Sequence, residues 1–276
     1  MHRVVYAYRG KSVDAIINLT AGVAVATTVA AQHACRPAQR IKILVSGAIG
    51  GLFPDIDSFS VWPVLFGEWG FWQHAAPAGA DIYFGKSWYS HLAFMHSLLG
   101  LFLSTGAMAL LFSMLHTHVF RRSPNMISAL MYLGPYTIAF ALAYLLHLAG
   151  DLISPSGIWG GMALFFPAKQ YVGGWGLVWW WNNYDLLVIL LLCIVFNLAM
   201  TFGLPMRSEA SQRPPVFMFC LALLWISLQI SRRETDFNGQ NFVTNETLSH
   251  EFQESVLGAP VYHQMRKVDE ALPFGF

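Results

Sequence analysis

Long stretches without a single Asp, Glu, Lys or Arg constrain this chain more than any other feature of its sequence. They include residues 43–54, 87–120, 123–150, 186–206 and 214–231. Uncharged runs of about 18 or more residues are typical of helices that cross a membrane, because a charged side chain in hydrocarbon is costly. Only 11% of the 276 residues are charged, against about a quarter in soluble domains. The chain is therefore expected to be an integral membrane protein.

The apolar runs predict an all-α fold, a polytopic membrane bundle of about six hydrophobic helices. The expected helices lie at 14–34, 38–54, 91–116, 126–151, 184–204 and 214–231. The first is rich in Ala, Val and Thr, and small residues favour close helix packing inside a bundle. Pro135 falls within the fourth helix and is expected to kink it.

Composition divides the chain near residue 231. Residues 1–231 are expected to form a membrane-embedded domain. Residues 232–276 hold four Lys or Arg against seven Asp or Glu and are expected to form a polar tail outside the membrane. The first helix follows basic residues and ends near small ones, as a signal peptide does. Asp14 and Asn18 interrupt its start and favour a retained helix.

Charge and cysteine content exclude several classes of protein. A net charge of +1 argues against nucleic acid as a partner, which leaves membrane lipids as the expected partners and indicates no particular protein. Cys35, Cys193 and Cys220 show no CxxC spacing. We interpret them as small hydrophobic residues, with neither a disulfide framework nor a zinc-finger arrangement.

His147 and Asp151 stand in an otherwise apolar segment, YLLHLAGDLISPSG, residues 144–157. At i, i+4 they project from one helix face. Ionisable residues in a membrane span indicate a functional site, because burying them unpaired costs free energy. The alternative is a His–Asp hydrogen bond that orients the end of a helix.

Two further pairs accompany this motif. Asp55 and Asp57 follow the second predicted helix, where a loop allows both carboxylates to converge on a cation; a solvated acidic loop is the alternative. His91 and His96 open the third predicted helix. At i, i+5 they would point about 140° apart on a regular helix. We therefore expect His91 in the approach to that helix and His96 in its first turns, or else two interfacial histidines.

The alternating direction of successive helices brings these pairs together. The second helix ends, the third begins and the fourth ends at one membrane face, which collects Asp55, Asp57, His91, His96, His147 and Asp151. Imidazole and carboxylate are the usual non-thiolate ligands of zinc. The set predicts a site for one or two divalent metal ions, with zinc favoured and with Asp57 or Asp151 as the carboxylate that accepts a proton. Asp185 falls on the same face, as a ligand or as a helix N-terminal acid.

Loop charges give the expected orientation. The loops away from these residues contain seven basic residues and one acid, Glu209, whereas residues 55–90 hold one Lys and four acids. The positive-inside rule then places the predicted site outside the cytoplasm. Arg3, Arg9, Lys11, Arg232 and Arg233 argue for the opposite orientation.

In order and spacing, the motifs LFPDID, HLAFMHS and HLAGDLISPSG resemble the YdjM-like family of bacterial inner-membrane proteins. The resemblance covers about residues 14–170 and implies an inner-membrane location, metal-dependent hydrolase activity and metal binding by the six residues above. That family is in turn thought similar to zinc-dependent phospholipase C and P1 nuclease. Leu92 and Ala93 replace an Arg-Gly pair of the family, and Asn18 stands where the family has a histidine.

Two functions from different classes follow. The first is a membrane-bound hydrolase that uses a metal-activated water on a phosphoester such as a phospholipid headgroup. The second is a non-catalytic metal-binding scaffold. A transporter would place its polar residues near the bilayer midplane. Here they are expected at one end of the helices, which disfavours transport. A phosphatidate-phosphatase motif would need His rather than Ile158 after PSG, and a zinc protease would need HExxH.

Overall fold

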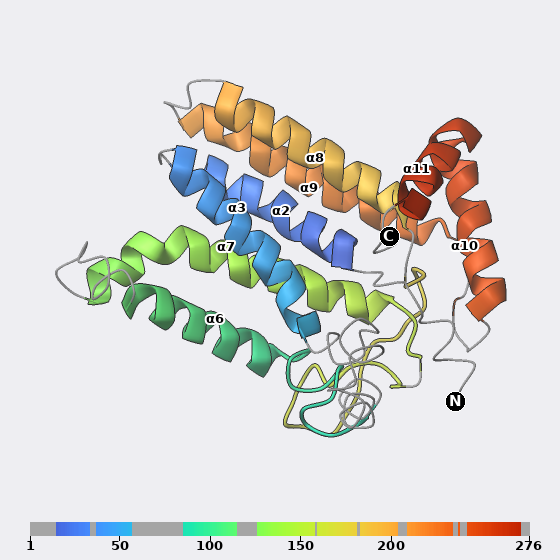
Figure 1. Ribbon diagram of the computed structural model, residues 1–276, viewed down its shortest axis with the longest axis horizontal. Coiled ribbons are helices and arrows are strands. Elements are labelled where there is room, and N and C mark those ends of the chain that lie inside the picture. Colours follow the sequence, from blue (N-terminus) through green and yellow to red (C-terminus); the bar gives the residue numbers. More distant parts are fainter. Residues whose placement is uncertain are drawn as a thin grey trace.

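The computed structural model describes residues 15–33, 37–56, 85–114, 126–157, 159–180, 183–203, 209–233, 237 and 242–271. Within these ranges the protein is all-α, with eight helices and no strand (Figure 1). The predicted fold class is confirmed.

Six of these helices run back and forth along one axis and form a bundle (Figure 1). They are α2 (Ala15–Ala31), α3 (Pro37–Leu52), α6 (Leu98–Met114), α7 (Met126–Ile153), α8 (Tyr184–Gly203) and α9 (Glu209–Ser231). Helix α2 lies at the centre and contacts α3, α7, α8 and α9, whereas α6 packs against α7 at the edge.

Three helical stretches among the described residues are long and apolar enough to cross a membrane: Leu133–Ile153, Tyr184–Phe202 and Arg213–Ser231. Ala15–Ala31 and Leu98–Met114 are shorter apolar helices. Pro135 lies inside α7, which continues through it.

Glycines let α2, α3 and α7 approach one another closely. A methyl group added at Gly22 would lie 2.3 Å from the carbonyl oxygen of Gly47, and one at Gly51 would lie 2.2 Å from that of Asn18. A methyl group at Gly50 would lie 2.4 Å from the carbonyl oxygen of Phe140. Only a hydrogen atom fits at such contacts, so the backbones touch, as in other small-residue interfaces between membrane helices. The end of α3 is thereby held directly against α2 and α7.

The third predicted helix begins at Leu98, so the expected start at residue 91 was wrong. Ser97 caps α6, because its Oγ accepts a hydrogen bond from the Gly100 amide at 3.0 Å. The turns at 91–97 are held by two backbone hydrogen bonds to a later loop. The Ala163 amide donates to the Leu92 carbonyl at 2.8 Å, and the Leu98 amide donates to the Leu164 carbonyl at 2.9 Å.

The tail contains two helices that the sequence analysis did not predict, α10 (Phe242–Leu257) and α11 (Ala259–Ala271). Gly258, with φ of 77°, makes the turn between them. Both lie beside the end of the bundle where α8 begins (Figure 1). Two hydrogen bonds of 2.7 Å attach them there: the Tyr184 amide donates to Gln253, and the Tyr184 hydroxyl donates to Asp269.

Candidate metal centre

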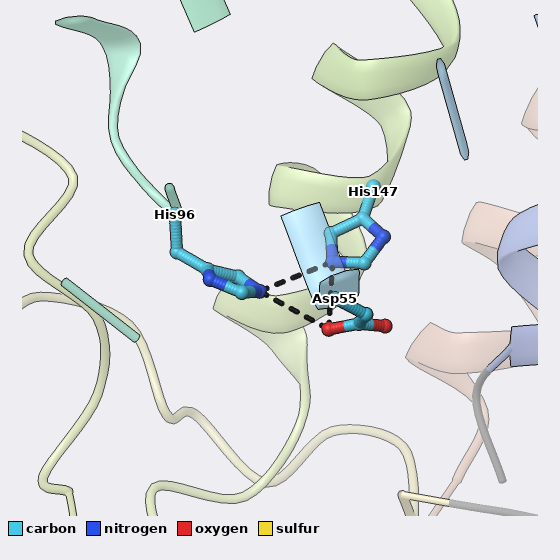
Figure 2. Close-up of side chains that lie close together, drawn as sticks. All are labelled: Asp55, His96 and His147. Carbon is cyan, nitrogen blue, oxygen red and sulfur yellow. Dashed lines mark hydrogen bonds and ion pairs between the residues drawn. The ribbon is translucent and has the colours of Figure 1, made fainter. Parts of the chain in front are cut away.

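The candidate site lies at one end of the bundle, where α3 and α7 end and α6 begins (Figure 1). Asp55 follows α3 in a short helical turn, His96 stands in the turn before α6, and His147 lies near the end of α7. One ligand atom from each of these three residues lies within 4.8 Å of the other two. Figure 2 shows the two imidazole rings and the carboxylate pointing toward one another.

Two nearly equilateral triangles of ligand atoms make up the site. The Nε2 atoms of His96 and His147 are 3.3 Å apart and form the edge that both triangles share. Asp55 Oδ1 lies 3.3 Å from Nε2 of His96 and 3.5 Å from that of His147. Asp151 Oδ2 completes the second triangle, at 3.3 Å and 3.2 Å from the same two atoms. We call these four residues the His–Asp cluster.

The dimensions of the cluster fit a divalent metal ion. Zinc binds N and O ligands at about 2.0–2.1 Å, which in a tetrahedral ion places neighbouring ligand atoms about 3.3–3.4 Å apart. Hydrogen bonds alone do not satisfy the cluster, because each Nε2 carries at most one proton yet faces two carboxylates and the other imidazole. Asp151 Oδ2 is buried and accepts no well-formed hydrogen bond from the described residues. Two imidazoles and two carboxylates thus form a donor set suited to a cation.

The backbone of α3 fixes which ring nitrogen of His147 carries a proton in the neutral ring. Its Nδ1 lies 2.7 Å from the carbonyl oxygen of Gly51, and because a carbonyl oxygen only accepts, Nδ1 must be the donor. In the neutral ring this leaves Nε2 with a free lone pair facing the cluster. Metal-binding histidines commonly donate their other N–H to a carbonyl in this manner. His147 is therefore held in the tautomer that a metal ion requires.

Asp55 is oriented from both sides. His91 Nε2 lies 3.9 Å from Asp55 Oδ1, and the His91 ring packs edge-on against Trp159 with ring centroids 5.7 Å apart. Asn18, buried in the first turn of α2, donates from Nδ2 to Asp55 Oδ2 at 3.5 Å. One carboxylate oxygen of Asp55 thus faces the cluster, while the other faces α2.

Two opposing effects act on the Asp55 carboxyl. Burial by itself would raise its pKa, because a charged carboxylate is poorly solvated there. The imidazoles of His147, His96 and His91 favour the charged form, and together they hold the pKa of Asp55 well below its usual range. The carboxylate is therefore ionised and available as a ligand at neutral pH.

Of the six predicted ligands, five lie near one another: Asp55, His91, His96, His147 and Asp151. The sixth, Asp57, lies outside the described residues. Asp185 does not join the cluster, since both of its carboxylate oxygens accept hydrogen bonds from Arg233 Nη2, at 3.0 Å and 2.8 Å.

Sequence reasoning missed two hydrogen-bonding groups beside the histidines, the Gly51 carbonyl and the Tyr144 hydroxyl. Tyr144 donates to the carbonyl of Met95, the residue before His96. No sequence pattern marks either contact. The run of glycines at 47, 50 and 51 was the available signal for a close helix approach at this point.

Comparison with known protein families gives one match. A family model described as YdjM inner membrane protein matches residues 14–235, a range that includes the whole His–Asp cluster. No curated protein and no solved structure matches the chain.

Proposed function

The chain belongs to the YdjM inner membrane protein family, and from this premise we propose that it is a membrane-bound, metal-dependent hydrolase. The proposed substrate is a phosphoester such as a phospholipid headgroup. The observation that carries the proposal is the pair of ligand triangles at the end of the bundle, each built from two imidazoles and one carboxylate with ligand atoms 3.2–3.5 Å apart.

Asp55, His96 and His147 would hold the metal with one ligand atom each, which leaves a fourth position for water. Asp151, beside the same two imidazoles, is a further carboxylate donor. Zinc suits this donor set best, because it accepts imidazole and carboxylate together in a tetrahedral arrangement. When bound, such an ion lowers the pKa of a coordinated water toward neutrality and polarises a phosphoryl oxygen. His91 is a further nitrogen donor beside Asp55, so the proposal includes one or two ions.

Exposure favours catalysis over a purely structural role. The side chains of His96 and His147 are 0% exposed, whereas those of Asp55 and Asp151 are 21% and 16% exposed. The imidazoles are thus anchored inside the bundle, and the proposal has water or substrate approach from the carboxylate side, where the side chains are partly exposed. Structural metal sites are closed, while catalytic sites keep a position open. A non-catalytic metal-binding scaffold is the second candidate for the same residues.

We assign proton transfer to a carboxylate. Asp151 is partly exposed and stands one turn after His147, so it is placed to accept a proton from water and to return it to the leaving oxygen. Asp57 is the other residue proposed for this role, because the DID motif places it two residues after Asp55. With Leu92 in place of the arginine that related sequences carry, we expect phosphate recognition to be weaker than theirs or altered.

Metal analysis of the detergent-purified protein is the first test. The wild type should retain a divalent metal, and His147→Ala should lose it. Asp151→Asn and His147→Ala should then abolish hydrolysis of mixed bacterial phospholipids or of a generic phosphodiester, assayed with added zinc or manganese. Both variants should stay folded in membranes, because neither change touches the apolar packing of the helices.

The scaffold alternative makes a different prediction for the same variants. A structural metal contributes folding free energy, so both substitutions should lower thermal stability in step with metal loss. That result, together with no turnover of any ester by the wild type, would replace the hydrolase proposal with the scaffold.

For its location we propose the bacterial inner membrane, with several spans and with the cluster on the non-cytoplasmic face. The support is the excess of Arg and Lys in the connections at the opposite end of the bundle. The cluster would then face the lipid headgroups of the outer leaflet.

A further inference from the structure

We infer that Tyr144 is a positioning residue whose hydroxyl sets the place of His96 in the His–Asp cluster. The inference rests on the metal site proposed above, and it gives Tyr144 no contact with metal or substrate. Tyr144 lies in α7, one turn before His147, and is fully buried.

The two histidines of the cluster differ in how the chain holds them. His147 sits inside α7, so the helix itself fixes its backbone. His96 stands in the turns at 91–97, outside any helix. The hydrogen bonds from Ala163 to Leu92 and from Leu98 to Leu164 hold the two ends of these turns. Between them the His96 amide donates to the Ala93 carbonyl at 3.1 Å, a bond within the turns that does not link His96 to α7.

Tyr144 supplies the link to α7. Its hydroxyl donates to the carbonyl of Met95, the peptide group directly before His96. Tyr144 and His147 are at i, i+3 and share one face of α7. The hydrogen bond therefore ties the backbone beside His96 to the same helix surface that carries His147. This fixes the edge of 3.3 Å between the two Nε2 atoms, which both ligand triangles share.

The aromatic ring of Tyr144 restricts where its hydroxyl can go. It packs against Phe140, with ring centroids 6.0 Å apart, and against Phe53, with centroids 6.3 Å apart. Phe53 precedes Asp55 by two residues. Tyr144 thus contacts all three segments that bring ligands to the cluster: α7, the turn with His96 and the turn with Asp55.

The test removes one oxygen atom. Tyr144→Phe keeps the ring and its packing but leaves the Met95 carbonyl without its donor. Changes of this kind behind a metal ligand typically weaken metal binding about 10- to 100-fold. Co²⁺ is the probe: its affinity is measured by competition with a chromophoric chelator, and its visible d–d absorption reports the ligand geometry. We expect Tyr144→Phe to bind Co²⁺ about 10- to 100-fold more weakly, with a changed d–d spectrum.

Tyr184→Phe is the matched control. Tyr184 is also buried, and its hydroxyl donates to Asp269 at 2.7 Å, at the start of α8 rather than in the cluster. Both variants lose one buried hydrogen bond, so both should lose a similar amount of thermal stability. Only Tyr144→Phe should change the Co²⁺ affinity and spectrum.

A second pair of variants at position 144 controls for misfolding of Tyr144→Phe. 4-Aminophenylalanine and 4-methylphenylalanine, incorporated at position 144, fill nearly the same space with and without a donor. The amino analogue should bind Co²⁺ close to wild type, and the methyl analogue should not. Equal Co²⁺ affinity and spectra for wild type and the donor-free variants would overturn the role of Tyr144 alone. A wild type that binds no Co²⁺ would overturn the metal site and this inference with it.

Discussion

At the scale of single residues, two fully buried imidazoles and two partly exposed carboxylates share one site, where protons compete with a metal ion for the ligand atoms. The pKa of Asp55 is held below its usual range by the neighbouring imidazoles. Acid should therefore displace a metal by protonating imidazole nitrogens before it protonates Asp55.

Metal affinity is accordingly expected to fall as the pH is lowered, because an imidazole binds a metal only through a deprotonated nitrogen. Asp55 should contribute little to this fall near neutral pH, because its lowered pKa keeps the carboxylate ionised there. Co²⁺ titrations at a series of pH values measure the slope. A fall confined to pH values below about 4 would mean that only carboxylates bind the ion.

At the scale of helices, the close contact between α2 and α3 depends on glycine. A methyl group at Gly47 would lie 2.5 Å from both the Ala26 Cβ and the Gly22 carbonyl oxygen, whereas one at Gly106 in α6 would meet nothing within 4 Å. Gly47→Ala should therefore lower the free energy of unfolding by about 1–3 kcal/mol. Gly106→Ala, the matched control, should leave it unchanged or raise it by about 0.5–1 kcal/mol.

The measurement is the thermal unfolding midpoint of the two glycine variants in detergent micelles, followed by circular dichroism. Equal midpoints for Gly47→Ala and Gly106→Ala would show that α2 and α3 adjust to the added methyl group without cost.

Helix by helix, the uncharged runs located the membrane helices but not all of their ends. The uncharged run 123–150 placed α7, and the alternation of helix directions predicted which ends would meet. The start of α6 could not be predicted, because residues 91–97 contain no Asp, Glu, Lys or Arg and so continue the uncharged run of the helix after them. Their turns depend on backbone hydrogen bonds to residues 163 and 164, far along the chain. Helices α10 and α11 have no apolar run and left no such signal.

The candidate site, too, could be predicted from the sequence only in part. His147 and Asp151 could be paired from their i, i+4 spacing alone. Tyr144 and Gly51 could not be linked to them, because each acts through one hydrogen bond across the bundle. Such contacts depend on the packing of helices and have no periodic pattern in the sequence.

At the scale of the whole molecule, a buried ion pair joins the bundle to the tail. Arg233 Nη2 lies 2.8 Å from Asp185 Oδ2, and both side chains are 1% exposed. The Arg233 guanidinium also lies over the ring of Phe252 in α10, at 4.9 Å from its centroid. The pair therefore connects α8, the end of α9 and α10.

Arg233→Ala should destabilise the protein by about 3–5 kcal/mol, because it leaves Asp185 charged and buried without a partner. Replacing both residues, as Asp185→Leu with Arg233→Met, should cost much less, since no unpaired charge remains. Thermal unfolding of the two variants measures the difference. If the double variant proves less stable than Arg233→Ala, the pair contributes through its attraction and not through the cost of an unpaired charge.

Orientation in the membrane can be tested by labelling. In a background without Cys35, Cys193 and Cys220, Arg122→Cys should resist a membrane-impermeant thiol reagent applied to intact cells and should react once the cells are opened. Labelling in intact cells would show that the molecule is inserted the other way round.

The His–Asp cluster and the helices α10 and α11 lie at the same end of the bundle (Figure 1). The opposite end, where α6 ends at Met114 and α7 begins at Met126, carries none of them. A rigid partner domain grafted between these two helices would add mass and an orientation marker to a membrane protein of 30.8 kDa. The ligand residues would be untouched by the graft. Electron cryo-microscopy of such a chimera would image the metal in place.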